Sequence, residues 1–381
     1  MDQKTRLLAM ASLAAVSNLV WAQAAAPSTS CESVVLNFNS CSTSFSPSFS
    51  SPAACQAFFQ ENHPECFTTS NKSSTSAQIA ATSVQQITTI STAVSGRLLA
   101  LGFRGPADQK LGAASGVTGL AAAGNTKPYG IWGNIGQART AYDGDSGVNN
   151  ADKFSSTVTN TVFGLDYGFA ADKIAGVSVA LDHGNGSLGV SAAGTTTSGL
   201  SIAPYFGWQL NKTLALDASL GWGDGKFTSA GTNKSDTKRT FYAVNLSYAE
   251  WRGNLQLQGK AGYLVAKENY GDQVQNGASL ANTSSSNTLS QFRIGGEVGY
   301  WMNNGTMPFL GLAYLSEDRS GSNAAGLANN SKLGTSAFLA SLGVNFFSLS
   351  SGVTGGVLYT QELSRSNGKN NGLSANVSMK F

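Results

Sequence analysis

The sequence predicts an all-β fold, a closed twelve-stranded antiparallel barrel that spans a membrane. Three observations lead to this prediction. Apolar and polar residues alternate along the C-terminal two-thirds of the chain, short turns alternate with longer polar connections, and charged residues make up only 12% of the sequence. A strand that faces lipid on one side and a narrow lumen on the other has this pattern and few charges.

The alternation is clearest in the last predicted strand. Leu373, Val377 and Phe381 share one face, while Asn376 and Lys380 share the other. We count twelve segments with this period of two, and single-chain bacterial barrels have an even number of strands. The residues opposite the apolar face are mostly Gly, Ser, Ala and Asn, which suits a crowded lumen. The alternative fold, a β-sandwich, carries Lys, Glu and Thr on that face.

The predicted connections alternate in length, as in a barrel with short periplasmic turns and long outer loops. The short turns are expected near Ala171-Asp172, Asn211-Lys212, Arg252-Gly253, Asn303-Gly305 and Ser348-Ser351. The long loops are expected at 138–156, 184–196, 228–238, 271–287, 316–335 and 363–371. This alternation places the start of the first strand and Phe381 on the periplasmic side.

Aromatic residues stand at the predicted strand ends, where they are expected to form the girdles that border the lipid. They are Tyr129, Trp132, Tyr167, Trp208, Trp222, Tyr248, Trp251, Tyr300 and Trp301. Outer-membrane lipid, including lipopolysaccharide, is therefore the first expected partner of the barrel.

The N-terminus is predicted to be a cleaved export signal, residues 1–24. Lys4 and Arg6 precede an apolar run over 7–20, and Ala22-Gln23-Ala24 has the small-x-small pattern of a cleavage site. The run is shorter than the ~20 residues of a membrane-spanning helix, which disfavours the alternative, an uncleaved anchor. The chain is therefore expected to be exported and to reach a bacterial outer membrane.

The next segment, 25–75, is rich in Ser and Thr and holds all four cysteines, Cys31, Cys41, Cys55 and Cys66. In an oxidising periplasm or at the cell surface, four cysteines are expected to form two disulfides, with three possible pairings. A zinc site is the alternative, but no Cys-x-x-Cys spacing and no nearby histidine pair supports it.

An amphipathic helix is predicted over 76–103, where apolar residues recur at steps of three and four. Arg97 is the only charged residue in it. A Gly/Ala-rich linker, 104–126, separates this helix from the barrel, which is predicted over 127–381.

The helix and the barrel together resemble the translocator unit of the monomeric autotransporter family. The resemblance covers 76–381 and rests on an ordered set of short motifs. These motifs are Ser95-Gly96-Arg97-Leu98 near the end of the helix, Tyr129-Gly130-Ile131-Trp132-Gly133 in the first strand, Phe163-Gly164-Leu165-Asp166-Tyr167 and the stretch 214–223 in later strands, and the closing Asn376-Val377-Ser378-Met379-Lys380-Phe381.

The resemblance implies that the helix threads through the lumen of the barrel. It also implies that Val377, Met379 and Phe381 form a signal read by the outer-membrane barrel assembly machinery, after periplasmic chaperones deliver the chain. A usual passenger in this family has hundreds of residues, whereas only 25–75 precedes the helix here. Because 76–103 contains no asparagine pair, we expect no self-cleavage inside the barrel.

Charged residues on the predicted lumen face are the main candidates for function. They are Asp166, Asp182, Asp217, Lys260, Arg293 and Glu297. Because buried charges need partners, we hypothesise that Arg97 pairs with Asp166 or Asp217 and so holds the helix as a plug. The alternative is that these charges face water in the pore and pair with one another.

The sequence offers little for catalysis, and it predicts no cofactor and no metal. His63 and His183 are the two histidines, and the outward neighbours of His183 along its strand are Leu181 and Val179 rather than the serine of a hydrolase site. The formal charge of +3 is scattered and indicates no nucleic-acid partner. We therefore expect a monomeric barrel without enzymatic activity.

These features favour an outer-membrane barrel that displays or translocates its short N-terminal segment. Two alternatives remain, a diffusion channel whose lumen charges act as a selectivity filter, and a surface adhesin that binds through its loops. The helix favours the first function, because a simple porin begins its barrel soon after the signal peptide.

Overall fold

The computed structural model of the chain describes most of the predicted barrel. The described residues are 128–142, 154–188, 194–229, 233–275, 277–280, 284–302, 305–322, 334–347, 353–366 and 368–381. The predictions for the leader 1–24, the cysteine segment 25–75, the helix 76–103 and the linker 104–126 lie outside the described residues. Among the residues described, no helix is long and apolar enough to cross a membrane.

The described part of the chain is almost entirely strand. It holds fourteen strands, of which two are only three residues long. They are β1 (Tyr129–Tyr142), β2 (Phe154–Ala170), β3 (Lys173–Leu188), β4 (Gly194–Gln209), β5 (Leu214–Ser229), β6 (Asn233–Arg252), β7 (Leu255–Tyr270), β8 (Gln273–Gln275), β9 (Ala278–Leu280), β10 (Ser285–Tyr300), β11 (Thr306–Ser322), β12 (Ser336–Phe347), β13 (Val353–Leu363) and β14 (Gly368–Lys380).

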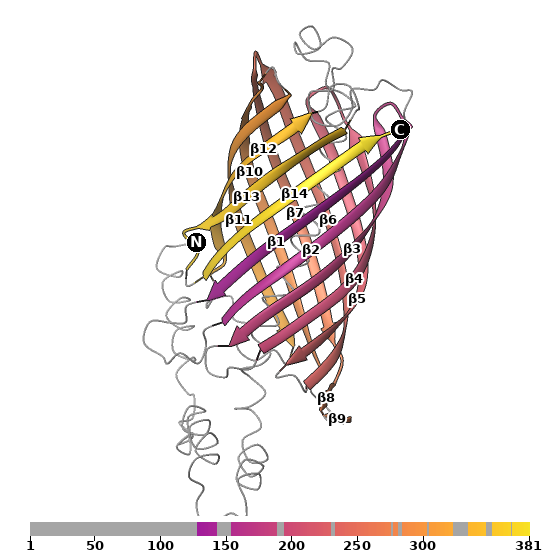
Figure 1. Cartoon of the computed structure of the whole chain (residues 1–381), viewed down its shortest axis with the longest axis vertical. Coiled ribbons are helices and arrows are strands. Elements are labelled where there is room, and N and C mark those ends of the chain that lie inside the picture. The colour runs from indigo at the N-terminus through magenta and orange to yellow at the C-terminus, as the bar shows by residue number, and fades with distance from the viewer. Residues whose placement is uncertain are drawn as a thin grey trace, which may run out of the picture. The chain divides into compact units, whose positions relative to one another are not determined.

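The twelve long strands of the described region form a closed antiparallel ring, in which β1 lies beside the yellow β14 (Figure 1). The ring closes because β5 also pairs with β6, and because β1 pairs with β14 from Gly130 and Lys380 to Tyr142 and Gly368. The prediction of a twelve-stranded barrel is confirmed. The short strands β8 and β9 form a hairpin that continues the sheet beside the N-terminal end of β6.

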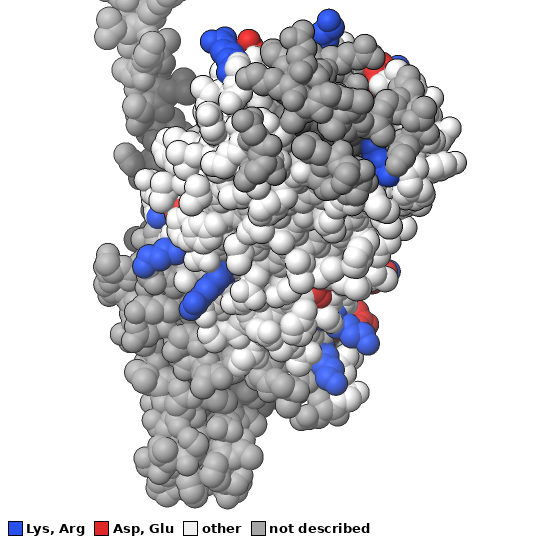
Figure 2. All heavy atoms as spheres, turned by 45° about the horizontal axis from the view of Figure 1, so that its top comes forward, with Lys and Arg blue, Asp and Glu red and all other residues white. Residues whose placement is uncertain are grey.

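The outer face of the ring is apolar, as the period of two predicts. In β4 the exposed and buried positions alternate along nearly the whole strand, so that Leu200 and Ile202 point outward while Ser201 and Ala203 point inward. Where described atoms are visible in Figure 2, charged side chains are few on an otherwise white surface. A continuous exposed apolar face is stable in contact with lipid rather than water.

Six of the nine predicted girdle residues are exposed on the outer face, but Trp132, Trp251 and Trp301 are buried. For these three residues the girdle prediction is wrong. The alternation along the strand explains why Trp132 is buried. Its neighbour Ile131 is exposed on the outer face, and successive side chains of a strand point to opposite faces. Trp251 and Trp301 instead form an inner cluster with Met307.

Most connections lie where they are predicted, but strands extend into the predicted long loops, as the third and the sixth illustrate. β5 continues to Ser229 and β6 begins at Asn233, while β13 continues to Leu363 and β14 begins at Gly368. In both hairpins the strand pairing extends past the apolar residues into a polar stretch, because backbone hydrogen bonds between strands do not require lipid.

Candidate functional site: the inner face of the barrel

The inner face carries the charged residues that the sequence predicts there. Asp166 and Asp217 are buried and Lys260, Arg293 and Glu297 are half-buried, and Asp166, Arg293 and Glu297 each lie beside an exposed apolar residue of their strand. Arg97, the proposed plug residue, lies outside the described residues, so its pairing with Asp166 or Asp217 stays a prediction.

Four of these residues come together on neighbouring strands. Lys260 on β7 interacts electrostatically with Asp217 on β5 and with Arg293 and Glu297 on β10. Asp217 also accepts a hydrogen bond of 2.8 Å from Nδ2 of Asn245 on β6. The set therefore forms one patch of mixed charge, in which each sign has a partner of the opposite sign within the wall.

Asp166 belongs to a separate aromatic group. The hydroxyl of Tyr205 on β4 donates to Oδ2 of Asp166 at 3.3 Å, and the same hydroxyl accepts a 2.8 Å hydrogen bond from Nε1 of Trp132. An alanine Cβ at Gly164 would lie 2.0 Å from the ring of Trp132. The absence of a side chain at this position therefore makes room for the tryptophan on the inner wall.

A buried ion-pair group on the inner face includes two residues that the sequence analysis missed. Nη1 of Arg239 on β6 lies 3.0 Å from Oδ1 of Asp182 on β3, and its Nε lies 3.4 Å from Oε2 of Glu268 on β7. All three side chains are almost fully buried. We call Arg239, Asp182 and Glu268 the β3–β6 bridge. The alternation along β6 is the signal that could have identified Arg239, because it shares the inner face with Phe241 and Ala243.

Glycines on the two intervening strands make the β3–β6 bridge possible. In the strand register Asp182 faces Gly199 on β4, which faces Gly225 on β5. A Cβ added at Gly199 would lie 2.8 Å from Oδ1 of Asp182, and one at Gly225 would lie 2.7 Å from Oγ1 of Thr237. Arg239 can therefore reach β3 along the wall because no side chain rises from the strands between them.

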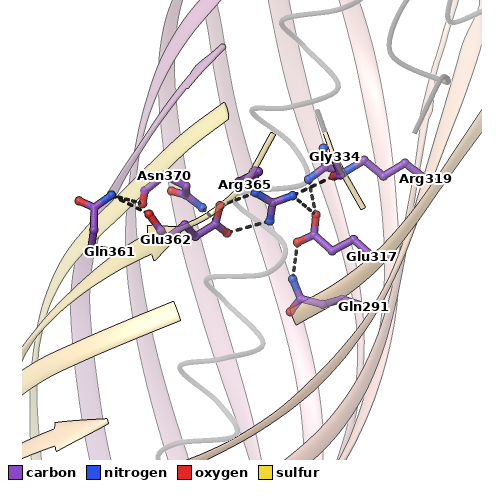
Figure 3. Close-up of polar contacts among 8 residues, drawn as sticks. All are labelled: Gln291, Glu317, Arg319, Gly334, Gln361, Glu362, Arg365 and Asn370. Carbon is purple, nitrogen blue, oxygen red and sulfur yellow. Dashed lines mark hydrogen bonds and ion pairs between the residues drawn. The ribbon is translucent and has the colours of Figure 1, made fainter. Parts of the chain in front are cut away.

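A second ionic network lies at the long-connection end of the lumen (Figure 3). Arg365, from the connection between β13 and β14, stands between two carboxylates. Its Nε and Nη2 donate to the carboxylate oxygens of Glu362, and its Nη1 donates to Oε2 of Glu317 on β11 at 3.0 Å. Nη1 also donates to the carbonyl oxygen of Gly334 at 3.2 Å. We call this group the Arg365 network.

Neighbouring side chains complete the Arg365 network. Glu317 also accepts hydrogen bonds from Arg319 at 2.6 Å and from Gln291 on β10 at 2.7 Å. Burial by itself lowers the pKa of Arg365, but its hydrogen bond to Glu362 and the two nearby negative charges outweigh burial and raise that pKa. Arg365 therefore stays charged, and it ties two connections of the long-loop end to the inner wall.

The C-terminal residues predicted as an assembly signal lie on the outer face of the seam between β1 and β14. Val377, Met379 and Phe381 are all exposed. Tyr129 and Phe381 exchange backbone hydrogen bonds of 3.3 and 3.2 Å, and their rings stack at 6.1 Å. These contacts put the terminal aromatic ring at the short-turn edge of the barrel.

The described residues offer no group of His, Cys, Asp and Glu side chains that could hold a metal ion. His183 lies across from Thr159 on β2 and Ser198 on β4 in the strand register. No hydrogen bond joins His183 to either hydroxyl among the described contacts. All four cysteines lie outside the described residues.

A closed ring of twelve strands, apolar outside and polar and charged inside, defines a transmembrane β-barrel of the outer-membrane class. Within that class, the family model described as "Autotransporter beta-domain" matches residues 131–360 of the chain. The match covers more than half of the chain, which therefore belongs to the autotransporter family. The described barrel is the outer-membrane translocator part of such a protein.

Solved structures of this family have the same fold. The translocator domain of the autotransporter NalP from Neisseria meningitidis is 10% identical with a TM-score of 0.52, and the match covers 68% of this chain and 90% of that one. The beta domain of the Bordetella autotransporter BrkA is 16% identical with a TM-score of 0.53, covering 67% and 100%. At these identities the likeness concerns the fold alone. No curated protein sequence matches the chain.

Proposed function

We propose that the barrel displays the chain's own N-terminal segment, residues 25–75, on the outside of the cell. The observation that carries this proposal is the closed barrel of a translocator family with a charged and polar inner face. A lumen of this kind can accommodate a hydrated polypeptide, and the Ser/Thr-rich composition of 25–75 suits passage through it. The predicted helix 76–103 would then connect the displayed segment to the barrel.

The proposal includes four further features. Residues 1–24 direct export, the four cysteines form two disulfides in the displayed segment, and the chain reaches the outer membrane through periplasmic chaperones and the barrel assembly machinery. The barrel works as a monomer in contact with outer-membrane lipid, without nucleic acid. We assign it no catalytic step, and its function is transport and display.

Surface labelling of inserted epitopes tests the display. An epitope inserted at Ser46-Pro47 should be labelled by antibody on intact cells, because the segment has crossed the membrane. A matched epitope after Gly277, between β8 and β9, should also be labelled. One at Asn211-Lys212, in a short turn, should be labelled only after permeabilisation. Labelling of the Ser46-Pro47 epitope only after permeabilisation would refute the display.

A diffusion channel is the second candidate, and the mixed charges around Lys260 favour it. Single-channel recording of the full chain in planar bilayers separates the two functions. If Arg97 holds the helix as a plug, Arg97→Ala should raise the conductance, whereas Arg252→Ala, an exposed residue at the short-turn end, should not. Unchanged conductance in Arg97→Ala would exclude the plug.

A further inference from the structure

The outer face of β5, β6 and β7 carries a group of basic residues beyond the apolar belt. Its members are the exposed side chains of Lys226, Lys234, Lys238 and Lys267, which we call the lysine face. None of the four has an ion-pair or hydrogen-bond partner among the described residues. No described side chain therefore binds their ammonium groups, which lie on the outside of the wall.

The strands β5, β6 and β7 share one spacing between an aromatic residue and a lysine on the outer face. An exposed aromatic residue is followed, four residues toward the long-connection end, by a lysine. The pairs are Trp222 with Lys226, Tyr242 with Lys238, and Tyr263 with Lys267. Four residues of a strand tilted by ~40° rise about 10 Å along the bilayer normal.

This spacing places the lysine face at the level of lipid headgroups. Aromatic girdles sit at the boundary between acyl chains and headgroups, so a lysine about 10 Å beyond that boundary meets the polar part of the lipid. The long connections of an outer-membrane barrel face outward. The headgroups beside the lysine face are therefore those of the outer leaflet.

The charge of this surface suits an anion. Asp224 and Asp236 lie opposite Lys238 and Lys226 in the strand register, and four lysines against two aspartates leave this surface a net charge of +2. Lys238 faces Asn269, two residues from Lys267 on the same outer face, a diagonal of roughly 7–8 Å between strand neighbours. Two flexible lysine stems at this separation can bring both ammonium groups onto one phosphate.

The opposite rim of the barrel shows a different arrangement. There two basic side chains have acidic partners, Lys173 with Asp172 at 3.1 Å and Arg252 with Glu250 at 3.4 Å, while Lys212 in the turn between β4 and β5 has none among the described residues. On the described outer face, basic side chains without an ion-pair partner are thus concentrated at the end of the barrel that carries the long connections.

We propose that the lysine face binds the phosphate groups of an anionic phosphorylated glycolipid of the outer leaflet. The acyl chains of this lipid lie against Trp222, Tyr242 and Tyr263, and its phosphates contact Lys226, Lys238 and Lys267. The proposal depends on the barrel lying in the outer membrane with its long connections outward, and is independent of the display of 25–75.

The test measures binding of purified lipid A carrying two phosphates to the full chain refolded in neutral detergent micelles. Lys226→Gln/Lys238→Gln/Lys267→Gln should raise the dissociation constant about 100-fold, because each basic residue near an anionic surface contributes about a fivefold factor. The matched control, Lys173→Gln/Lys212→Gln/Arg252→Gln, loses the same charge at the other rim and should leave the constant unchanged. An equal loss in both variants, or no loss in the first, would overturn the proposal.

Two further arms separate this lipid from other ligands. Dephosphorylated lipid A with the same acyl chains should bind weakly to the unmodified chain, and tight binding would reduce the site to an apolar surface and refute the proposal. Inorganic phosphate should not displace lipid A, and complete displacement would refute the glycolipid in favour of a general anion site. If the glutamine variant fails to refold, Lys226→Arg/Lys238→Arg/Lys267→Arg replaces it, and loss of binding in that charge-retaining variant would also refute the proposal.

Discussion

Glycines on the inner face determine where the large side chains of the barrel wall can lie. A Cβ at Gly164 would meet the ring of Trp132 at 2.0 Å, and a Cβ at Gly221 would meet the ring of Phe241 at 2.0 Å. A β-strand interior ordinarily disfavours glycine. Here the glycines leave room for the aromatic rings of the neighbouring strand, which pack against the inner wall where a side chain would otherwise stand.

Substitution at Gly164 tests this fit. Gly164→Ala should destabilise the barrel by about 1–3 kcal/mol, as extra atoms in a packed interior do, because Trp132 must move away from its hydrogen bond with Tyr205. The free energy of unfolding in urea, measured on the refolded chain in micelles, reports the change. Gly259→Ala is the matched control, because the nearest atom to its added Cβ is 3.9 Å away. Equal stability of the two variants would contradict this account of Gly164.

The β3–β6 bridge is the other feature that belongs to single residues. Arg239→Met leaves Asp182 and Glu268 buried without their cation, and breaking a buried pair in this way costs about 3–5 kcal/mol. Adding Asp182→Asn and Glu268→Gln should recover most of that loss, because no charge then remains unpaired. The same unfolding measurement checks both steps. A triple variant as unstable as Arg239→Met would show that the bridge contributes through packing rather than charge.

The sequence predicted the strands of the barrel better than any other level of its structure. The period of two predicted the number of long strands and the outward faces of β2, β4, β6, β10 and β14, because lipid tolerates few polar side chains. It did not predict where strands end, as at Ser229 and Asn233, since beyond the belt water accepts either face. The ionic networks were missed for a related reason: their members come from strands far apart in the chain, so no local pattern joins them.

The Arg365 network fixes the connection between β13 and β14 to the inner wall of β11. Arg365→Gln should release this connection and increase the closing and reopening of single channels in planar bilayers, because a freed segment at the mouth fluctuates into the current path. Arg139→Gln, at an exposed position on the outer face of β1, removes the same charge without touching the network and should not change the recordings. Identical traces for the two variants would show that the connection is held by other contacts.

For the whole barrel, stability depends on the seam between β1 and β14. Phe381 contributes backbone hydrogen bonds to Tyr129 at its edge, yet its side chain is exposed to lipid. We therefore expect Phe381→Ser to change refolding of the purified chain in micelles only slightly, since the lost apolar contact is peripheral.

The same substitution should act strongly in cells if Phe381 is an assembly signal. The amount of folded barrel in the outer membrane, seen as a heat-modifiable band on gels, should fall several-fold for Phe381→Ser. Leu342→Ser, an equally exposed apolar position on β12, serves as the control and should assemble at near-normal levels. A parallel fall in both variants would assign the defect to lost lipid contact instead of recognition.

The seam between β1 and β14 also means that the barrel can close only after its last strand is present. Gly130, near the start of the barrel, pairs with Lys380, near its end, so the sheet has free edges until the final strand has been delivered. Contacts between residues so distant in the chain make folding slow, and a free β-edge invites pairing with other chains. A cell that makes this protein must therefore keep the nearly finished chain apart from its copies for as long as the last strand is awaited.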